Sequence, residues 1–168
     1  MPTSQAATSA DMTTPSLTKA GSEGGRLSSF LCFAVYSANL AFGRAYKPIL
    51  DKLGLTYTQY IAMVALSDAD DQTVGALGEK LFLESNTLTP LLKKLEAMGY
   101  ILRLRDPADE RQVRVSLTPA GRGLVETDPG AALIDAIGLG EDFPVVQQSV
   151  ARLRDNLLRA TQAKPEKP

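Results

Sequence analysis

Apolar residues recur at helical spacing along most of this chain, and the pattern predicts a mainly helical protein. The clearest helix begins at Ser85 or Asn86, either of which can cap its first turn, and ends before Gly99. Its four leucines share one face: Leu88, Leu91, Leu92 and Leu95. Other helices are predicted from Thr56 or Thr58 through Leu66, over residues 75–82, from Thr118-Pro119 onward, and over residues 144–161.

Two short runs rich in β-branched residues, leucine and arginine follow the clearest helix, at residues 101–105 and 113–117. The segment between them, residues 106–111, has the proline and aspartate content of a turn. A short helix, a tight link, a second helix and a strand–turn–strand unit form the pattern of a winged helix-turn-helix. The predicted fold class is mainly α with a small β-wing.

The first predicted helix is apolar around most of its circumference. It covers residues 30–45, and Ser28 or Ser29 can cap it. A helix that is apolar on most sides is buried on most sides, which in a domain of this size indicates contact with a second subunit. Pro48 is expected to kink or restart the helix, and Gly54 to end the segment that follows.

The chain is expected to form one domain over residues 26–163, with the DNA-binding winged helix at 73–118. Residues 1–25 are rich in Ser, Thr, Ala and Gly and are predicted to be a disordered tail, and residues 164–168 to fray. No apolar run approaches the length of a membrane span, and the start of the chain lacks a signal-peptide pattern. We therefore expect a cytoplasmic protein without a membrane partner.

The 168 residues carry a net charge of −1, so the whole chain makes no electrostatic case for nucleic acid. The charge is nevertheless segregated. Residues 86–105 carry a net charge of +3, whereas residues 68–84 hold five acids and one lysine. This segregation can present one basic face to phosphates, although a solvated helix face explains the charge equally well.

Histidine is absent from the chain, and Cys32 is the single cysteine. These two facts exclude Ser-His-Asp and Cys-His catalysis, most zinc sites and any internal disulfide. We therefore expect no catalytic residue, no metal or cofactor site, and no enzyme activity.

A recognition helix reads base edges with short or polar side chains in its N-terminal part and contacts phosphates further along. The wing arginines suit phosphate contacts, and Arg111 suits a minor groove. Asp109 either positions the Arg111 guanidinium or forms an exposed pair with it. The predicted DNA-binding residues are Ser85, Asn86, Thr87, Thr89, Pro90, Lys93, Lys94, Arg105, Asp109, Arg111 and Arg114. The alternative is a packing module that binds no DNA.

The wing sequence from Asp106 to Pro119 resembles that of the MarR family of dimeric winged-helix repressors. The stretches LCFAVYSA at 31–38, YKPIL at 46–50 and LTY at 55–57 resemble its organic-hydroperoxide-sensing OhrR branch, and the match runs from about residue 30 to 130. The resemblance implies a homodimer, which assigns residues 26–54 and 119–163 as dimerisation helices. It also implies an inverted-repeat operator on double-stranded DNA.

The same resemblance implies that oxidation of Cys32 relieves repression. Tyr46 and Tyr57 match two tyrosines that hydrogen-bond the cysteine from the partner subunit, and Tyr36 matches a further tyrosine near it. The chain has no second cysteine, so it resembles the one-cysteine type. Its partners would then include an organic hydroperoxide and a low-molecular-weight thiol that completes the switch.

The chemistry of the residues is compatible with that role. Only a thiolate attacks a peroxide, and a place in the first turn of a helix favours the anion of Cys32. Tyr36, four residues later, lies on the same helix face. Without the resemblance, Cys32 is more simply a small buried apolar residue. Two alternatives remain: a repressor released by a small phenolic or aromatic ligand with an inert Cys32, and a thiol-dependent peroxidase.

Overall fold

The computed structural model describes residues 26–162, except for the side chains of residues 132, 135 and 162. The tails expected at 1–25 and 164–168 lie outside the described residues. The chain divides into two compact units, residues 1–38 and 39–168. The first contains the short 3-10 helix η1 (Arg26–Ser29) and the start of α1 (Leu31–Leu50), which continues into the second.

Helix α1 begins one residue later and ends five residues later than the pattern predicted. The Ser29 hydroxyl does not cap α1 but donates to the carbonyl of Arg26, at 2.8 Å. Helical structure also continues through Pro48 to Leu50, so the expected restart at Pro48 is wrong. The proline removes one backbone donor, and the helix ends two residues after it. The short η2 (Asp51–Leu53) follows, and Gly54 ends it at φ 67° as predicted.

Helix α2 (Tyr57–Asp68) is the centre of the core of the second unit. Thr56 caps it as predicted: its hydroxyl accepts from the backbone N–H of Gln59, whose side chain accepts from the Thr56 N–H in return. Ala62, Met63 and Leu66 on α2 are fully buried. They belong to a cluster that also includes the leucines of α4.

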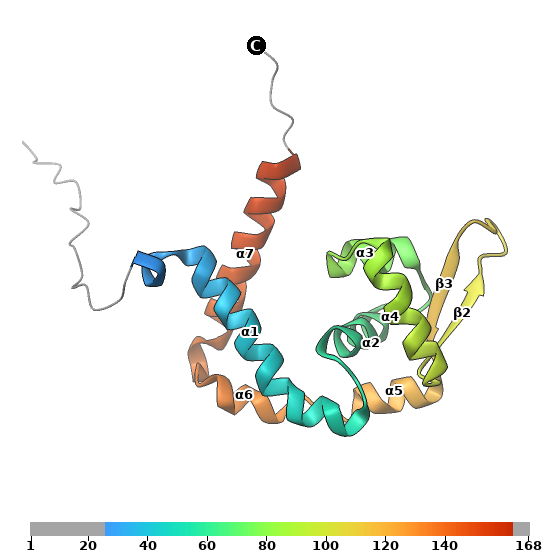
Figure 1. Ribbon diagram of the computed structural model, residues 1–168, viewed down its shortest axis with the longest axis horizontal. Coiled ribbons are helices and arrows are strands. Elements are labelled where there is room, and N and C mark those ends of the chain that lie inside the picture. Colours follow the sequence, from blue (N-terminus) through green and yellow to red (C-terminus); the bar gives the residue numbers. More distant parts are fainter. Residues whose placement is uncertain (1–25, 163–168) are drawn as a thin grey trace, which may run out of the picture. The chain divides into compact units, whose positions relative to one another are not determined.

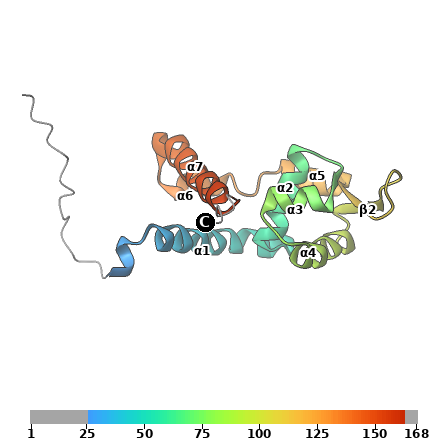
Figure 2. The same ribbon diagram turned by 90° about the horizontal axis from the view of Figure 1, so that it is seen from above.

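The helix-turn-helix consists of α3 (Val74–Leu81) and α4 (Ser85–Ala97), which lie against α2 (Figures 1 and 2). The Thr73 hydroxyl caps α3, which begins and ends one residue earlier than the predicted helix at 75–82. The cap of α4 was mispredicted: Glu84 occupies that position and makes no side-chain bond, while Ser85 is already helical. A reversal at Phe82, which has a φ of 56°, brings α4 in immediately after α3 and sets this start.

A three-stranded antiparallel sheet in the order β1-β3-β2 completes the winged helix, and this confirms the predicted fold class. Strands β2 (Ile101–Arg105) and β3 (Val113–Leu117) have the bounds expected from the sequence. The two-residue β1 (Gln72–Thr73), which pairs with β3, was missed. The β2–β3 hairpin projects beyond the neighbouring helices in both ribbon views (Figures 1 and 2).

Helix α5 (Pro119–Glu126) starts directly after β3 and lies against α2 (Figure 2). Thr118 caps it, with proline at the first helical position, as predicted. The short α6 (Ala132–Ile137) was not anticipated, because six residues give too little periodicity to detect. After η3 (Gly140–Asp142), α7 (Phe143–Gln162) covers the predicted last helix. Within residues 26–162, no helix is long and apolar enough to cross a membrane.

Candidate functional sites: the winged helix and a tyrosine cluster

The recognition helix α4 presents a polar outer face over a fully apolar inner one. Leu88, Leu92 and Leu95 are completely buried and fix the rotation of the helix about its axis. The predicted base-reading residues Ser85, Asn86 and Thr87 are therefore exposed at its N-terminal end, with Pro90, Lys93 and Lys94 exposed further along and Thr89 partly buried.

Asp109 organises the backbone of the wing turn. Its Oδ1 accepts from the Arg111 backbone N–H at 3.1 Å, and its Oδ2 from Gln112 Nε2 at 3.1 Å. Among the described residues, no ion pair joins Asp109 to the Arg111 guanidinium, so the expected pairing is corrected. The Arg111 side chain projects from a turn whose shape Asp109 fixes. Arg105 reaches the same turn, since its Nη1 donates to the carbonyl of Glu110 at 2.8 Å.

Two of the arginines near the wing are engaged within the protein. The side chain of Arg103 is only 17% exposed and faces Glu96 of α4, with Nη1 to Oε2 at 3.2 Å. The Arg114 guanidinium lies between Asp71 and Asp106, at 2.9 Å and 3.2 Å. These carboxylates raise the pKa of Arg114, and Arg114 in turn lowers the pKa of Asp71. Arg103 and Glu96 cancel within the net charge of +3 counted for residues 86–105, so that charge comes from Lys93, Lys94 and Arg105.

Tyr46, Tyr57 and Tyr60, the tyrosine cluster, lie together beneath the turn after α5. The ring centroids of Tyr46 and Tyr57 are 4.9 Å apart, and those of Tyr46 and Tyr60 are 5.9 Å apart. Burial is the main cause that raises the pKa of each phenol, and the charge of Asp128 adds to it for Tyr46 and Tyr60.

The turn at Asp128–Gly130 fits closely over this cluster. A Cβ atom on Gly130 would lie 2.6 Å from the Tyr46 hydroxyl, so only glycine leaves that phenol its place. Tyr60 also lies close to this turn, because both Asp128 and Gly130 influence the pKa of its phenol. The sequence reasoning missed Tyr60, although its spacing of three residues from Tyr57 puts both on one face of α2.

The structure therefore brings together two of the four residues predicted to sense peroxide. Cys32 and Tyr36 belong to the first unit, where Cys32 is the second residue of α1 and its free thiol is exposed. Tyr36 is exposed too, and its ring lies 6.4 Å from that of Phe33. The alternative that Cys32 is buried in a core does not hold within this chain.

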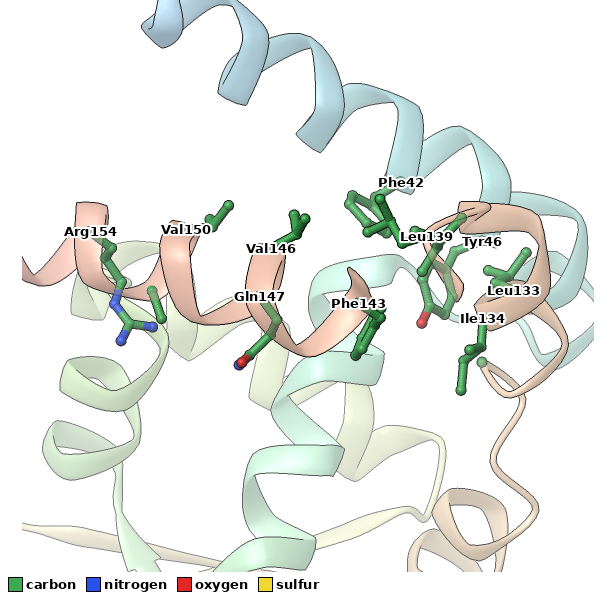
Figure 3. A pocket seen from close by; sticks show the side chains of 13 residues that line it. Phe42, Tyr46, Leu133, Ile134, Leu139, Phe143, Val146, Gln147, Val150 and Arg154 are labelled. Carbon is green, nitrogen blue, oxygen red and sulfur yellow. The ribbon is translucent and has the colours of Figure 1, made fainter. Parts of the chain in front are cut away.

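A largely apolar cavity of about 440 Å³ lies next to the tyrosine cluster, between residues 42–46 of α1, α6 and α7. In Figure 3, Val146 and Val150 point from α7 toward Phe42, whereas Gln147 and Arg154 point to the other side of α7. Arg154 extends to the end of α3, where its guanidinium carbon lies 5.4 Å from the centre of the Phe82 ring. Tyr46 contributes the phenol at the end of the cavity near α6.

Comparison with known proteins identifies relatives over most of the chain. The sequence model of transcriptional regulators of the SarA/Rot type matches residues 44–127. The HTH-type transcriptional regulator TtmR of Methylorubrum extorquens is 54% identical over 98 residues, an alignment covering 58% of this chain and 50% of TtmR, so the match spans half of that relative. The organic hydroperoxide resistance transcriptional regulator of Bacillus subtilis is 40% identical over 135 residues, covering 79% of this chain and 92% of the relative.

Solved structures of AbfR from Staphylococcus epidermidis share the fold. Reduced AbfR bound to DNA matches with a TM-score of 0.67 and 31% identity, over 79% of this chain and 95% of AbfR. Overoxidised AbfR bound to DNA matches with a TM-score of 0.62 and 34% identity, over the same shares of the two chains. The disulfide form of AbfR matches with a TM-score of 0.53 and 35% identity, over 76% of this chain and 92% of AbfR.

Proposed function

Because this chain belongs to the SarA/Rot-type, MarR-like family of transcriptional regulators, we propose that it is a repressor that leaves its operator when an organic hydroperoxide oxidises Cys32. It is a DNA-binding regulator of the MarR/OhrR type. The observation that carries the finer proposal is the exposed thiol of Cys32, the only cysteine, in a chain 40% identical to the B. subtilis hydroperoxide regulator.

In the DNA complex, α4 occupies a major groove and the wing follows the adjacent backbone. Ser85, Asn86, Thr87, Thr89 and Pro90 face base edges, while Lys93, Lys94 and Arg105 meet phosphates. Arg111 enters the minor groove from a turn shaped by Asp109. The exposure of α4's polar face and the projecting hairpin support this arrangement.

The repressor acts as a homodimer on an inverted repeat. Apolar side chains exposed on α7, among them Val145, Val150 and Leu157, would be covered by a second copy. Two copies place two recognition helices in successive major grooves, which explains why such operators are palindromic.

The proposed switch is a two-step thiol oxidation. The Cys32 thiolate attacks the distal oxygen of the hydroperoxide, the O–O bond breaks, and the alkoxide takes a proton to leave as an alcohol. The resulting sulfenic acid condenses with a small thiol, forming a mixed disulfide and releasing water. Tyr46 and Tyr57, contributed by the partner subunit, donate hydrogen bonds to the sulfur, with Tyr36 nearby. The bulk of the adduct then displaces the helices that hold the two wings at their spacing.

The test measures operator binding by fluorescence anisotropy, using a duplex selected from genomic fragments by the reduced protein. Wild type and Cys32→Ser are compared with no oxidant, with cumene hydroperoxide alone, and with hydroperoxide plus a small thiol. We expect release of wild type only, and fully only with the thiol, because overoxidised AbfR has been solved bound to DNA. Release of Cys32→Ser by hydroperoxide would contradict the proposal.

The apolar cavity favours a second candidate function, release by a small aromatic ligand. Its volume of about 440 Å³ is within the range of small-molecule sites, and Tyr46 offers a polar contact at one end. Titration of the DNA complex with phenolic compounds under fully reducing conditions separates the two functions. Release that is unchanged in Cys32→Ser would favour the ligand mechanism over oxidation.

A further inference from the structure

The acidic loop between α2 and β1 is tied to the wing and to α5 through specific contacts. Asp70 Oδ1 accepts from the backbone N–H of Leu117, the last residue of β3, at 2.9 Å. Its Oδ2 lies 2.7 Å from Nη2 of Arg122 in the first turn of α5. Burial tends to raise the pKa of Asp70, but the Leu117 N–H and Arg122 outweigh it and the pKa is lowered. One carboxylate thus joins the loop, the sheet and α5.

Asp71, the next residue, contacts β3 at Arg114, three residues closer to the wing tip than Leu117. Its Oδ1 accepts from Arg114 Nε at 2.9 Å, and its backbone carbonyl accepts from Nη2 of the same guanidinium. Asp71 adopts a φ of 54°, an unusual value for a residue other than glycine, which indicates that these contacts determine its backbone. Backbone and side chain of one residue therefore hold two nitrogens of Arg114.

The third nitrogen of Arg114 continues the connection into the wing turn. Its Nη1 lies 3.2 Å from Oδ2 of Asp106, the residue that follows β2. Asp106 Oδ1 accepts from the backbone N–H of Ala108 at 2.8 Å, and the Asp106 N–H donates to the Gln112 carbonyl at 3.0 Å. A continuous set of contacts therefore runs from the helical core to the base of the turn that carries Arg111.

We propose that Asp70 and Asp71 form a clasp that positions the wing on DNA, and that Arg114 serves DNA binding through this clasp and not by contacting a phosphate. Arg114 is then a positioning residue whose guanidinium is engaged on three sides, which corrects its assignment as a direct contact. The inference rests on DNA binding and not on oxidation of Cys32, so either can fail without the other.

The clasp makes an unusual prediction about charge. Near DNA, removal of a negative side chain ordinarily strengthens binding, because it removes repulsion from the phosphates. If Asp71 acts by orienting the wing, Asp71→Asn weakens binding instead. The amide keeps the size of the side chain but loses the charge-assisted bond to Arg114. The two explanations therefore predict effects of opposite sign.

Asp68→Asn is the matched control. Asp68 lies in the same acidic stretch, and its side chain is 68% exposed. Among the described residues its one ion pair is with the Lys80 amine, at 3.6 Å. Anisotropy titrations of the reduced proteins should show binding weakened about five- to tenfold by Asp71→Asn, and unchanged or slightly tighter for Asp68→Asn. Equal or tighter binding by Asp71→Asn than by Asp68→Asn would overturn the proposal.

Two conservative variants of Arg114 distinguish positioning from direct contact. Arg114→Lys keeps the positive charge but cannot span Asp71 and Asp106 together, so the clasp predicts that it binds as weakly as Arg114→Gln. A phosphate contact predicts that lysine restores most of the affinity. Because Arg114→Gln already removes the contacts to both Asp71 and Asp106, adding Asp71→Asn to it should weaken binding no further. Additive losses would refute the clasp.

Hydroxyl-radical footprinting controls for general loss of fold. In Asp71→Asn, the backbone protection made by the wing should disappear, while the protection of the sugars that flank the groove occupied by α4 persists at saturating protein. Uniform loss of both protections would show that the variant only unfolds the domain, and would count against the clasp.

Discussion

Gly121 in the first turn of α5 permits a close approach between that helix and the start of β2. A Cβ atom there would lie 2.1 Å from the carbonyl oxygen of Tyr100 and 3.2 Å from Cδ2 of Leu117. A carbon–oxygen contact needs about 3.3 Å, so in Gly121→Ala one backbone must retreat by about 1 Å. The Tyr100 carbonyl also accepts from the N–H and hydroxyl of Thr118, at 3.0 and 3.1 Å, and this retreat weakens both bonds.

We expect Gly121→Ala to lower the free energy of unfolding by about 2–4 kcal/mol, combining the cost of overpacking with the weakened hydrogen bonds. For a protein of this size the midpoint of thermal unfolding should fall by roughly 5–15 °C. Gly123→Ala, two residues along the same helix, is the control. No atom lies within 4 Å of its added Cβ, so it should stabilise by about 0.5–1 kcal/mol.

The assay is urea denaturation followed by circular dichroism. Thermal melts are compared at equal protein concentration, because the proposed dimerisation would make the midpoint depend on concentration. The two alanine variants should move in opposite directions. If both stabilised the protein, the close approach of α5 to Tyr100 would not exist in solution, and our account of how the wing joins α5 would be wrong.

Three further predictions concern the described contacts. Burial raises the pKa values of the phenols in the tyrosine cluster, so an absorbance titration at alkaline pH should show them titrating above pH 10. The stability that the neutral phenols contribute is present below pH 10 and is lost as the pH rises through their pKa values in the folded protein. The carboxyl groups of Asp70, Asp71 and Asp106 have lowered pKa values in the folded protein. The stability that they contribute is therefore present above the pKa of an unfolded aspartate, about 3.9, and declines as the pH falls below it. Asp71→Asn should make this decline in the urea midpoint less steep. Thr56→Ala should destabilise by about 1 kcal/mol through loss of the α2 cap, and a midpoint shift no larger than that of Thr58→Ala would contradict this.

Local signals explain what the sequence could predict. The strands β2 and β3 were located correctly because β-branched runs flank a Pro/Asp turn. The caps at Thr56 and Thr118 were located because each threonine precedes a helical pattern. These features depend on residues within about four positions of one another. The same locality explains why the polar face of α4 was recognised.

Contacts between distant residues account for what was missed. Asp71 and Arg114 are 43 positions apart, so an acidic loop read along the sequence gave no sign that it holds the wing. Strand β1 has two residues and exists only because β3 pairs with it. The position of α4's start depends on the reversal at Phe82, where no glycine or asparagine marks a positive φ. The relation of Cys32 to the tyrosine cluster stays a prediction.

Strand β2 exposes its leucines and turns an arginine inward, and this arrangement affects whether two copies of the protein can pair through that strand. Leu102 and Leu104 are exposed on this strand, Arg103 faces inward, and β2 forms an edge of the sheet. An apolar edge strand is a template for pairing with another chain. An antiparallel pairing of two β2 strands centred on Arg103, however, sets that guanidinium against its own copy, which like-charge repulsion disfavours. Arginine at alternate positions of the wing therefore protects an edge strand as well as adding basic charge, even where it touches no DNA.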